Sequence, residues 1–535
     1  MRLGRMARWI LLASVMAALS AVVLGDLEHQ DWAYDDEDYI RSARHAGADF
    51  LYLLNPHKEG LEFDYNAARP TVHLYFWLLY PLLGENPGAY HLANVVVHTL
   101  NALLLSILVF AWCDRFRLAG MTGLLFLMNL SYFRAVYWIA GIGILLGTLL
   151  GFGSVLAMMA YLRTRRPVYW TLSFFLFLFA PFAHESAIVF IGLLAILCAR
   201  SEGTRRGLRL IAPHAAIILV TWAVSEFVYN TPLSRESDYR IGLHMARNLP
   251  GMVFNLFFHF FAGEYYDAEW YPVPVAGRIV AGMALLTGLL LIVRRVRPLA
   301  PVVVWLTFVL LPFLPFVDAT FAWRYHYLPA AAASLLTAAG VLWVGGRAAR
   351  KLRFHAGRSV LPLVLTAGLV GVAWPQVGLL MAIQHSFSGL YLSRNGSHER
   401  ALAQYEWADA KGGGHPAAYH WQYNKALTLL TLDRVEDGYR ILLRIVARYP
   451  LYERGRTVLL QAFARREGLE APRTASDGSL LLPKWIVDRM KEEALAAARA
   501  GRREEAEALT TVYLHFFVPD REREEILRES RGGTI

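Results

Sequence analysis

The fold is organised around the stretch Tyr34-Asp35-Asp36-Glu37-Asp38-Tyr39-Ile40, which follows a first apolar segment and precedes a long series of others. Four adjacent carboxylates beside a bilayer repel one another, and this makes it easier for one of them to take up a proton. An aspartate held near a membrane surface by the aromatic side chains of Trp32, Tyr34 and Tyr39 could act as a general base. The alternative interpretation is a solvated acidic loop that helps to keep this side of the chain outside.

The composition identifies the class of protein. Of the 535 residues, 56% are hydrophobic and only 18% are charged, whereas soluble domains carry roughly 25% charged residues. A formal charge of +10 would suit nucleic acid, but the arginines lie in short loops between apolar runs, where they set membrane orientation. The cysteines Cys113 and Cys198 lie at the ends of such runs, beside arginines, and predict no disulfide framework. We therefore expect a polytopic membrane protein with a soluble tail and no nucleic-acid partner.

Apolar runs predict an all-α bundle of about eleven membrane spans. The first follows Arg2, Arg5 and Arg8 and is interpreted as uncleaved, with a signal peptide as the alternative. The predicted spans are 9–25, 90–112, 118–133, 137–162, 168–183, 186–199, 210–228, 275–293, 299–317, 324–345 and 359–382. This assignment places every arginine-rich loop on the side of the amino terminus, the cytoplasm. Val72–Leu83 is too short to span and contains Pro81, so we expect it in the outer interface; Leu249–Gly263 is a second outer-surface or re-entrant segment.

The odd number of spans leaves residues 383–535 outside, after a membrane domain of residues 1–382 with an acidic outer loop at 26–70. Charged side chains collect on the turns of this outer side, and charges at a bilayer edge are unfavourable unless they are paired, hydrated or functional. They are 35–38, Arg69, Arg134, His184 with Glu185, the run 264–269, Asp318 and Arg324. Each alone is explained by a salt-bridged loop, but Arg69, Glu185 and Arg324 together favour a site.

A polar stripe runs along the second span. His91, Asn94, His98 and Asn101 lie on one helical face. Because unpaired polar groups are unfavourable in lipid, this face must meet protein or water. A cavity-lining role and a role in holding helices together both remain open.

Several short blocks resemble the GT-C membrane glycosyltransferases, most closely the protein O-mannosyltransferase-like proteins that carry tetratricopeptide repeats after the membrane domain. The blocks are YDDED at 34–38, ARP at 68–70, GENPGAYHLANVVVH at 84–98, HESAI at 184–188 and RYHYLP at 324–329. The resemblance implies a transferase in a bacterial inner membrane that uses a polyprenyl-phosphate sugar donor at the outer face, with an aspartate of the first outer loop as base. Asp35 and Asp36 match that aspartate, and we favour Asp36.

The same resemblance implies that Arg69 contacts the donor phosphate, with Arg324 as a second candidate and the role of Glu185 open. The residue types fit the chemistry, since sugar transfer from phosphate needs a carboxylate for the proton of the attacking hydroxyl and fixed positive charge for the departing phosphate. We expect an inverting enzyme, with mannose as one sugar to test. Asp267 and Glu269 have the spacing of a metal-binding pair, which leaves a divalent metal open.

The tail is a different kind of structure. Residues 421–450 have the helix-turn-helix layout of a tetratricopeptide unit, with Ala426 and Gly438 at the close helix contact. Helices near 398–409 and 486–515 would be its neighbours. The tail could simply cap the membrane domain, but we favour binding of a protein or glycan acceptor by residues 398–515. The alternative function is a non-enzymatic scaffold or lipid-glycan transporter that recruits partners through this tail. The absence of an internal sequence repeat in the membrane part favours the enzyme.

Overall fold

The structure is a computed structural model, and it describes residues 2–33, 36–49, 51, 53, 69–228, 240–258, 275–295, 299–315, 326–351, 357–468, 473–474, 480–481 and 483–517. Within these ranges the fold is all-α, as predicted, apart from one antiparallel pair of two-residue strands, β1 (Arg473–Thr474) and β2 (Leu480–Leu481). The chain forms two compact units, residues 1–380 and 381–535.

The first unit is an integral membrane bundle. In chain order its elements are α1 (Arg2–Leu24), η1 (Gly25–His29), α2 (Asp36–Ala46), α4 (Pro70–Leu83), α5 (Pro87–Cys113), α6 (Phe116–Leu127), η2 (Leu130–Tyr132), α7 (Phe133–Tyr137), η3 (Ile139–Gly141), α8 (Ile142–Thr164), α9 (Pro167–Ala183), η4 (Glu185–Val189), α10 (Phe190–Glu202), α11 (Thr204–Ala223), η5 (Val224–Val228), α12 (His244–Phe257), α13 (Val275–Arg295), α14 (Ala300–Leu310), η9 (Leu311–Phe313) and α15 (Tyr327–Lys351). The next helix, α16 (Gly357–Arg394), runs from the first unit into the second.

Five helices of the described ranges are long and apolar enough to cross a membrane: Met6–His29, Pro87–Cys113, Ile139–Thr164, Thr204–Phe227 and Tyr327–Ala348. Four shorter apolar helices accompany them, at Phe116–Leu127, Pro167–Ala183, Ala276–Leu291 and Ala300–Phe313. The predicted number of eleven spans therefore stays a prediction. One predicted span, 118–133, is interrupted, because α6 ends at Leu127 and the Asn129 side chain accepts a hydrogen bond from Ser131 N to begin η2.

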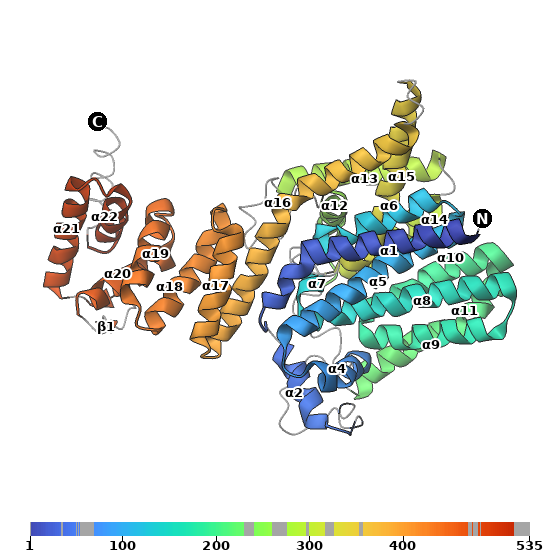
Figure 1. The fold of residues 1–535 in the computed structure, drawn as a ribbon, viewed down its shortest axis with the longest axis horizontal. Coiled ribbons are helices and arrows are strands. Elements are labelled where there is room, and N and C mark those ends of the chain that lie inside the picture. Colours follow the sequence, from blue (N-terminus) through green and yellow to red (C-terminus); the bar gives the residue numbers. More distant parts are fainter. Residues whose placement is uncertain are drawn as a thin grey trace. The chain divides into compact units, whose positions relative to one another are not determined.

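Glycines of α8 set the packing of the bundle's central helices. Figure 1 shows α8 and α9 side by side, and α5 packs against α8 as well. A Cβ at Gly143 would lie 2.8 Å from the Ala183 carbonyl oxygen, and one at Gly147 would lie 3.3 Å from the Ala180 carbonyl oxygen. A Cβ at Gly151 would collide with the ring of Phe190. This small-residue spacing of four lets the backbone of α8 approach the backbone at the end of α9, and leaves room for the Phe190 ring at the start of α10.

The outer loop folds onto α4 through aromatic side chains. Tyr39 of α2 stacks on Phe76 of α4 with ring centroids 4.9 Å apart, and Trp32 lies 6.0 Å from Tyr90 at the start of α5. Both Trp32 and Tyr39 are buried, whereas Tyr34 lies outside the described residues. Their role as a frame for the aspartate stays a prediction. With 14 residues, α4 is too short to cross about 30 Å of hydrocarbon.

The second unit continues with α17 (His398–Gly412), η11 (Pro416–Ala418), α18 (Tyr419–Thr431), α19 (Val435–Arg448), α20 (Glu453–Arg466), α21 (Lys484–Arg499) and α22 (Arg503–Phe517). The predicted helix-turn-helix at 421–450 corresponds to α18 and α19. Ala426 is buried, and a Cβ at Gly438 would lie 3.0 Å from the Ala426 carbonyl oxygen, which is the close contact expected there. Helices α19, α20, α21 and α22 share one apolar core around Leu442, Leu459 and Met490.

Candidate functional site

Asp36 is the buried carboxylate at the start of α2. Its side chain is fully buried, with Oδ2 accepting from Ala33 N at 3.0 Å and Oδ1 accepting from Ala140 N at 2.9 Å. The first contact closes the local turn, whereas the second joins the outer loop to η3, the first turn of the helix that continues as α8. Two backbone N–H donors stabilise a carboxylate charge, and the helix terminus favours that charge further.

Arg69 and Glu185 form a second charged group. Arg69 precedes Pro70 at the start of α4, and its Nη2 donates to Glu185 Oε1 at 3.0 Å and to Oε2 at 3.1 Å. The side chain of Arg69 is 24% exposed and that of Glu185 is 46% exposed. The pair therefore lies at the rim of the bundle, where a small molecule can compete for the guanidinium.

The buried His184 is the third member of this group and lies beside Glu185. Its Nδ1 accepts from Ser186 N at 3.2 Å, so a neutral ring carries its proton on Nε2, which lies 3.5 Å from Glu185 Oε1. Partial burial raises the pKa of the Glu185 carboxyl, but the charge of Arg69 and then the electrostatic interaction with the neighbouring His184 lower it by more, to about 2. Glu185 is consequently ionised at neutral pH.

The first turns of α8 bring these groups together. Asp36 binds the amide of Ala140, and Gly143 follows it by one helical turn. At Gly143 an added Cβ would lie 3.2 Å from Val72 Cγ2, and 2.8 Å from the oxygen of Ala183. Val72 is three residues after Arg69, and Ala183 is two residues before Glu185. Segments 36, 69 and 185 thus converge on one end of one helix.

The glycines were the part of the site that sequence reasoning missed. The signal that could have revealed them is the spacing of Gly143, Gly147 and Gly151 at intervals of four, which marks a face of close helix approach. That spacing identifies the helix on which separate loops meet, although it does not identify the loops.

The polar stripe of α5 holds helices together. Asn94 Nδ2 donates to the carbonyl of Trp138 at 2.9 Å, just before η3. His98 Nδ1 lies 2.8 Å from the hydroxyl of Tyr327, and Asn101 Nδ2 donates to the same hydroxyl at 3.0 Å. His91 is fully buried on the same face. Of the two interpretations left open, these contacts fit the structural one.

Four predicted site residues lie outside the described residues: Asp35, Arg324, Asp267 and Glu269. Within the described ranges, no three His, Cys, Asp or Glu side chains are arranged to hold a metal ion. The metal proposed for 267–269 is therefore untested.

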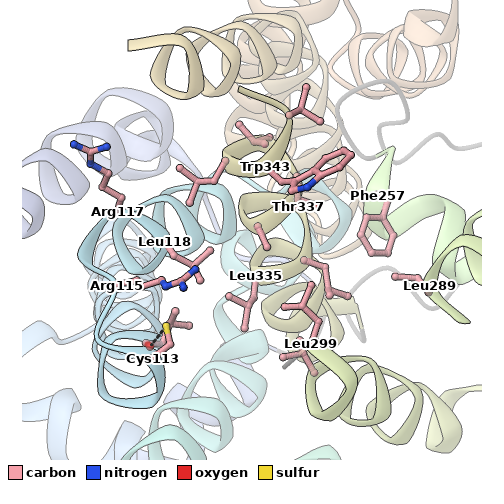
Figure 2. Close-up of a pocket in the computed structure, with 18 of the residues that line it drawn as sticks. Cys113, Arg115, Arg117, Leu118, Phe257, Leu289, Leu299, Leu335, Thr337 and Trp343 are labelled. Atoms are coloured by element: carbon pink, nitrogen blue, oxygen red, sulfur yellow. Dashed lines mark hydrogen bonds between the residues drawn. The ribbon is translucent and has the colours of Figure 1, made fainter. Parts of the chain in front are cut away.

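A large apolar cavity lies at the other end of α5. It has a volume of about 2040 Å³ and is bordered by α5, α6, α10, α12, α13, α14, α15 and α16. Figure 2 shows Phe257 and Leu289 on one side and Leu335 on α15. On α5 the lining begins at Leu105 and ends at Cys113, far from Asn94 and the convergence at α8.

The tail carries a smaller and more polar cleft. Its volume is about 380 Å³, and it lies between α18, α19 and α22 in the segment predicted to bind an acceptor. Its lining includes His415, Tyr419, Arg444, Arg448 and Glu507.

Comparison with known proteins finds one similar solved structure. No protein-family model matches this chain, and no curated protein matches it. Among solved structures, the crystal structure of ArnT from Cupriavidus metallidurans bound to undecaprenyl phosphate is similar, with 16% sequence identity, a TM-score of 0.38, and coverage of 81% of this chain and 80% of that chain.

Proposed function

We propose that this chain is a membrane glycosyltransferase that moves a sugar from a polyprenyl-phosphate donor to a hydroxyl acceptor. The observation that carries the proposal is the convergence of a fixed carboxylate, Asp36, and a rim guanidinium, Arg69, on the first turns of α8. Base and phosphate-binding cation are the two groups that this transfer requires. The sequence blocks that resemble GT-C enzymes include both residues.

Asp36 is the proposed general base. In a single displacement the acceptor oxygen bonds to the anomeric carbon while the bond from that carbon to the phosphate oxygen breaks. The electron pair of the broken bond leaves with the polyprenyl phosphate, and the hydroxyl proton passes to the Asp36 carboxylate. The sugar is inverted at the anomeric carbon. The two backbone hydrogen bonds would hold the carboxylate in place during this step.

Arg69 is the proposed phosphate ligand. Its charge is neutralised by Glu185, and a donor phosphate would compete with Glu185 for the guanidinium. A guanidinium presents a planar fork of N–H donors that suits phosphate, so lysine would be a partial replacement only. Arg324 and Asp35 remain candidates for the same two roles, and Asp267 with Glu269 for a metal site.

The orientation of the chain in the membrane and the docking place of the acceptor are also part of the proposal. The arginine-rich loops favour a cytoplasmic amino terminus in a bacterial inner membrane, with the site and the tail outside. The cleft between α18, α19 and α22 supports an acceptor that docks through residues 398–515.

Purified protein incubated with a panel of polyprenyl-phosphate sugars, mannosyl phosphate included, tests the function. We expect release of the lipid phosphate with at least one of them. Arg69→Ala should raise the KM for the donor by about tenfold or more, the loss of a charge-assisted hydrogen bond, and Arg69→Lys should recover part of it.

The matched control is Arg44→Ala, which removes another arginine of the outer loop, paired with Glu85 and about half-exposed. It should leave the KM unchanged. No turnover with any sugar of the panel would reject the enzyme in favour of a scaffold, and equal KM values for Arg69→Ala and wild type would remove Arg69 from the site.

A further inference from the structure

The cavity beside α5 is suited to a lipid rather than to a compact ligand. Pockets for drug-sized molecules occupy roughly 300 to 1,000 Å³, and this one has about twice the upper volume, at about 2040 Å³. Its lining is almost wholly apolar, with Leu108, Trp112, Leu285, Trp305 and Leu336 among the side chains. An aqueous solute would gain little from such a lining.

The length of the cavity matches one leaflet of a bilayer. On α15 the lining extends from Leu335 to Val344, which is about 14 Å at about 1.5 Å per residue. The hydrocarbon core of a bilayer is about 30 Å thick. The lining segments of α5, α6 and α14 are the last turns of α5 and the first turns of α6 and α14. The cavity thus occupies the leaflet next to the loop that joins α5 to α6.

Positive charge borders the cavity at that loop. Arg115 and Arg117 are its charged lining residues, and in Figure 2 the Arg115 guanidinium lies on the side facing α15, whereas Arg117 points away from it. Arg115 is also the residue at the start of α6, and its side chain does not cap that helix. An arginine beside an uncapped helix N-terminus is an arrangement that attracts an anion such as phosphate.

We propose that this cavity binds a phospholipid, with its acyl chains among α5, α12, α13, α15 and α16 and its phosphate at Arg115 and the first turn of α6. The occupant is distinct from the sugar donor. The rim is at Arg115, whereas the proposed transfer site adjoins Asn94 through Trp138; along α5 these ends are about 28 Å apart, measured from Asn94 to Cys113. One head group cannot serve both. This site goes beyond the proposed function, because it holds whether or not the chain transfers a sugar.

Glycines in the lining allow a direct test. A Cβ at Gly340 or at Gly368 would meet nothing within 4 Å, and both residues line the cavity. The Cβ of a leucine at either position would have no neighbour within 4 Å, so the rest of the side chain could extend into the space that the lipid would occupy. Gly346 on α15 and Gly371 on α16 are equally open but lie outside the lining, so their leucine variants are matched controls.

The experiment is native mass spectrometry of the full chain in detergent, titrated with dioleoyl phosphatidylglycerol. We expect one lipid per wild-type chain. Arg115→Ala should weaken binding about tenfold, the usual effect of losing a charge-assisted hydrogen bond, whereas Arg205→Ala, at an exposed arginine in the first turn of α11, should not. Gly340→Leu and Gly368→Leu should abolish the bound lipid, and Gly346→Leu and Gly371→Leu should retain it.

Three results would overturn the proposal. One is wild-type binding by Gly340→Leu and Gly368→Leu, which would place the lipid elsewhere. The second is equal binding of uncharged dioleoylglycerol, which would remove the phosphate from the recognition. The third is displacement of the phospholipid by an equimolar amount of undecaprenyl phosphate, which would assign the cavity to a polyprenyl chain.

Discussion

The replacement Asp36→Asn separates a catalytic role from a structural one. Both oxygens of Asp36 accept buried backbone N–H groups, from Ala33 and from Ala140. Asparagine keeps one acceptor oxygen, but its amide nitrogen cannot accept, so one of the two N–H groups loses its partner. A buried donor without an acceptor costs about 1 to 3 kcal/mol. We therefore expect a lower thermal stability in a chain that still folds.

The effect on transfer should be much larger. Loss of a general base typically lowers a rate by about 10²- to 10⁴-fold. Transfer from the best polyprenyl-phosphate sugar should be assayed well below the midpoint of thermal unfolding, so that the stability change does not enter the rate. The control is Asp49→Asn, an exposed carboxylate of the same loop that accepts from Leu51 N at 3.0 Å. It should change stability by less than about 0.5 kcal/mol and leave the rate unaltered.

Two outcomes would refute the reasoning in different places. If Asp36→Asn loses stability but transfers at the wild-type rate, Asp36 only caps the start of η3 and α8. If its thermal midpoint equals that of the wild type, the two buried hydrogen bonds are not formed as described. Only a loss of both, with the larger loss in rate, fits a base held by the backbone.

Three further predictions concern the surroundings of the site and the tail. The folded state stabilises the ionised form of Glu185, because it lowers the pKa of this carboxyl from 4.5 to about 2. This contribution to stability is complete above pH 4.5 and is lost as the pH falls towards 2, so over this range the thermal midpoint should fall more for the wild type than for Glu185→Gln. Parallel curves of midpoint against pH would disprove the stabilisation. Gly143→Ala should destabilise the bundle by about 1 to 3 kcal/mol, because its Cβ meets a carbonyl oxygen, whereas Gly153→Ala on the same helix meets only a leucine methyl group at 3.2 Å and should not; equal midpoints would contradict the close approach. In the tail, Arg466 is 21% exposed, binds two glutamates and lies 4.4 Å from the ring of Tyr439. Arg466→Ala should therefore lower the stability of the tail by about 2 kcal/mol or more and speed hydrogen exchange in α19 to α22. The control Arg440→Ala, at an exposed ion pair, should have little effect.

The charged residues of the site could be predicted from the sequence, because unpaired charges at a bilayer edge are energetically unfavourable. Arg69 and Glu185 were singled out because charges at a bilayer edge need a partner or a function, and the structure pairs them although they are 116 positions apart. The pairing itself was beyond the sequence, because it depends on how closely α8 approaches α4 and η4. That approach is set by Gly143 and Gly147, whose effect appears only when two backbones meet.

The polar stripe of α5 shows the opposite limit. Its period predicted correctly that His98 and Asn101 share a face, and both are buried. The partner is the Tyr327 hydroxyl, more than 220 positions away. A period describes which side chains point together, but it carries no information on the segment they meet. For the same reason it could not decide between a lining role and a structural one.

The two proposed lipid sites are expected to act independently. The rim at Arg115 and the pair at Arg69 lie near opposite ends of α5. Cys113 adjoins the first and Asn94 adjoins the second, and the two residues are about 28 Å apart along the helix. Perturbations separated by more than about 10 Å with no shared partner usually add. Arg115→Ala should therefore change phospholipid occupancy without changing the KM for the donor, and Arg69→Ala the reverse. Coupling between them would require a rigid element with two arrangements, whereas α5 is tied by hydrogen bonds from Asn94, His98 and Asn101 to Trp138, Leu127 and Leu145.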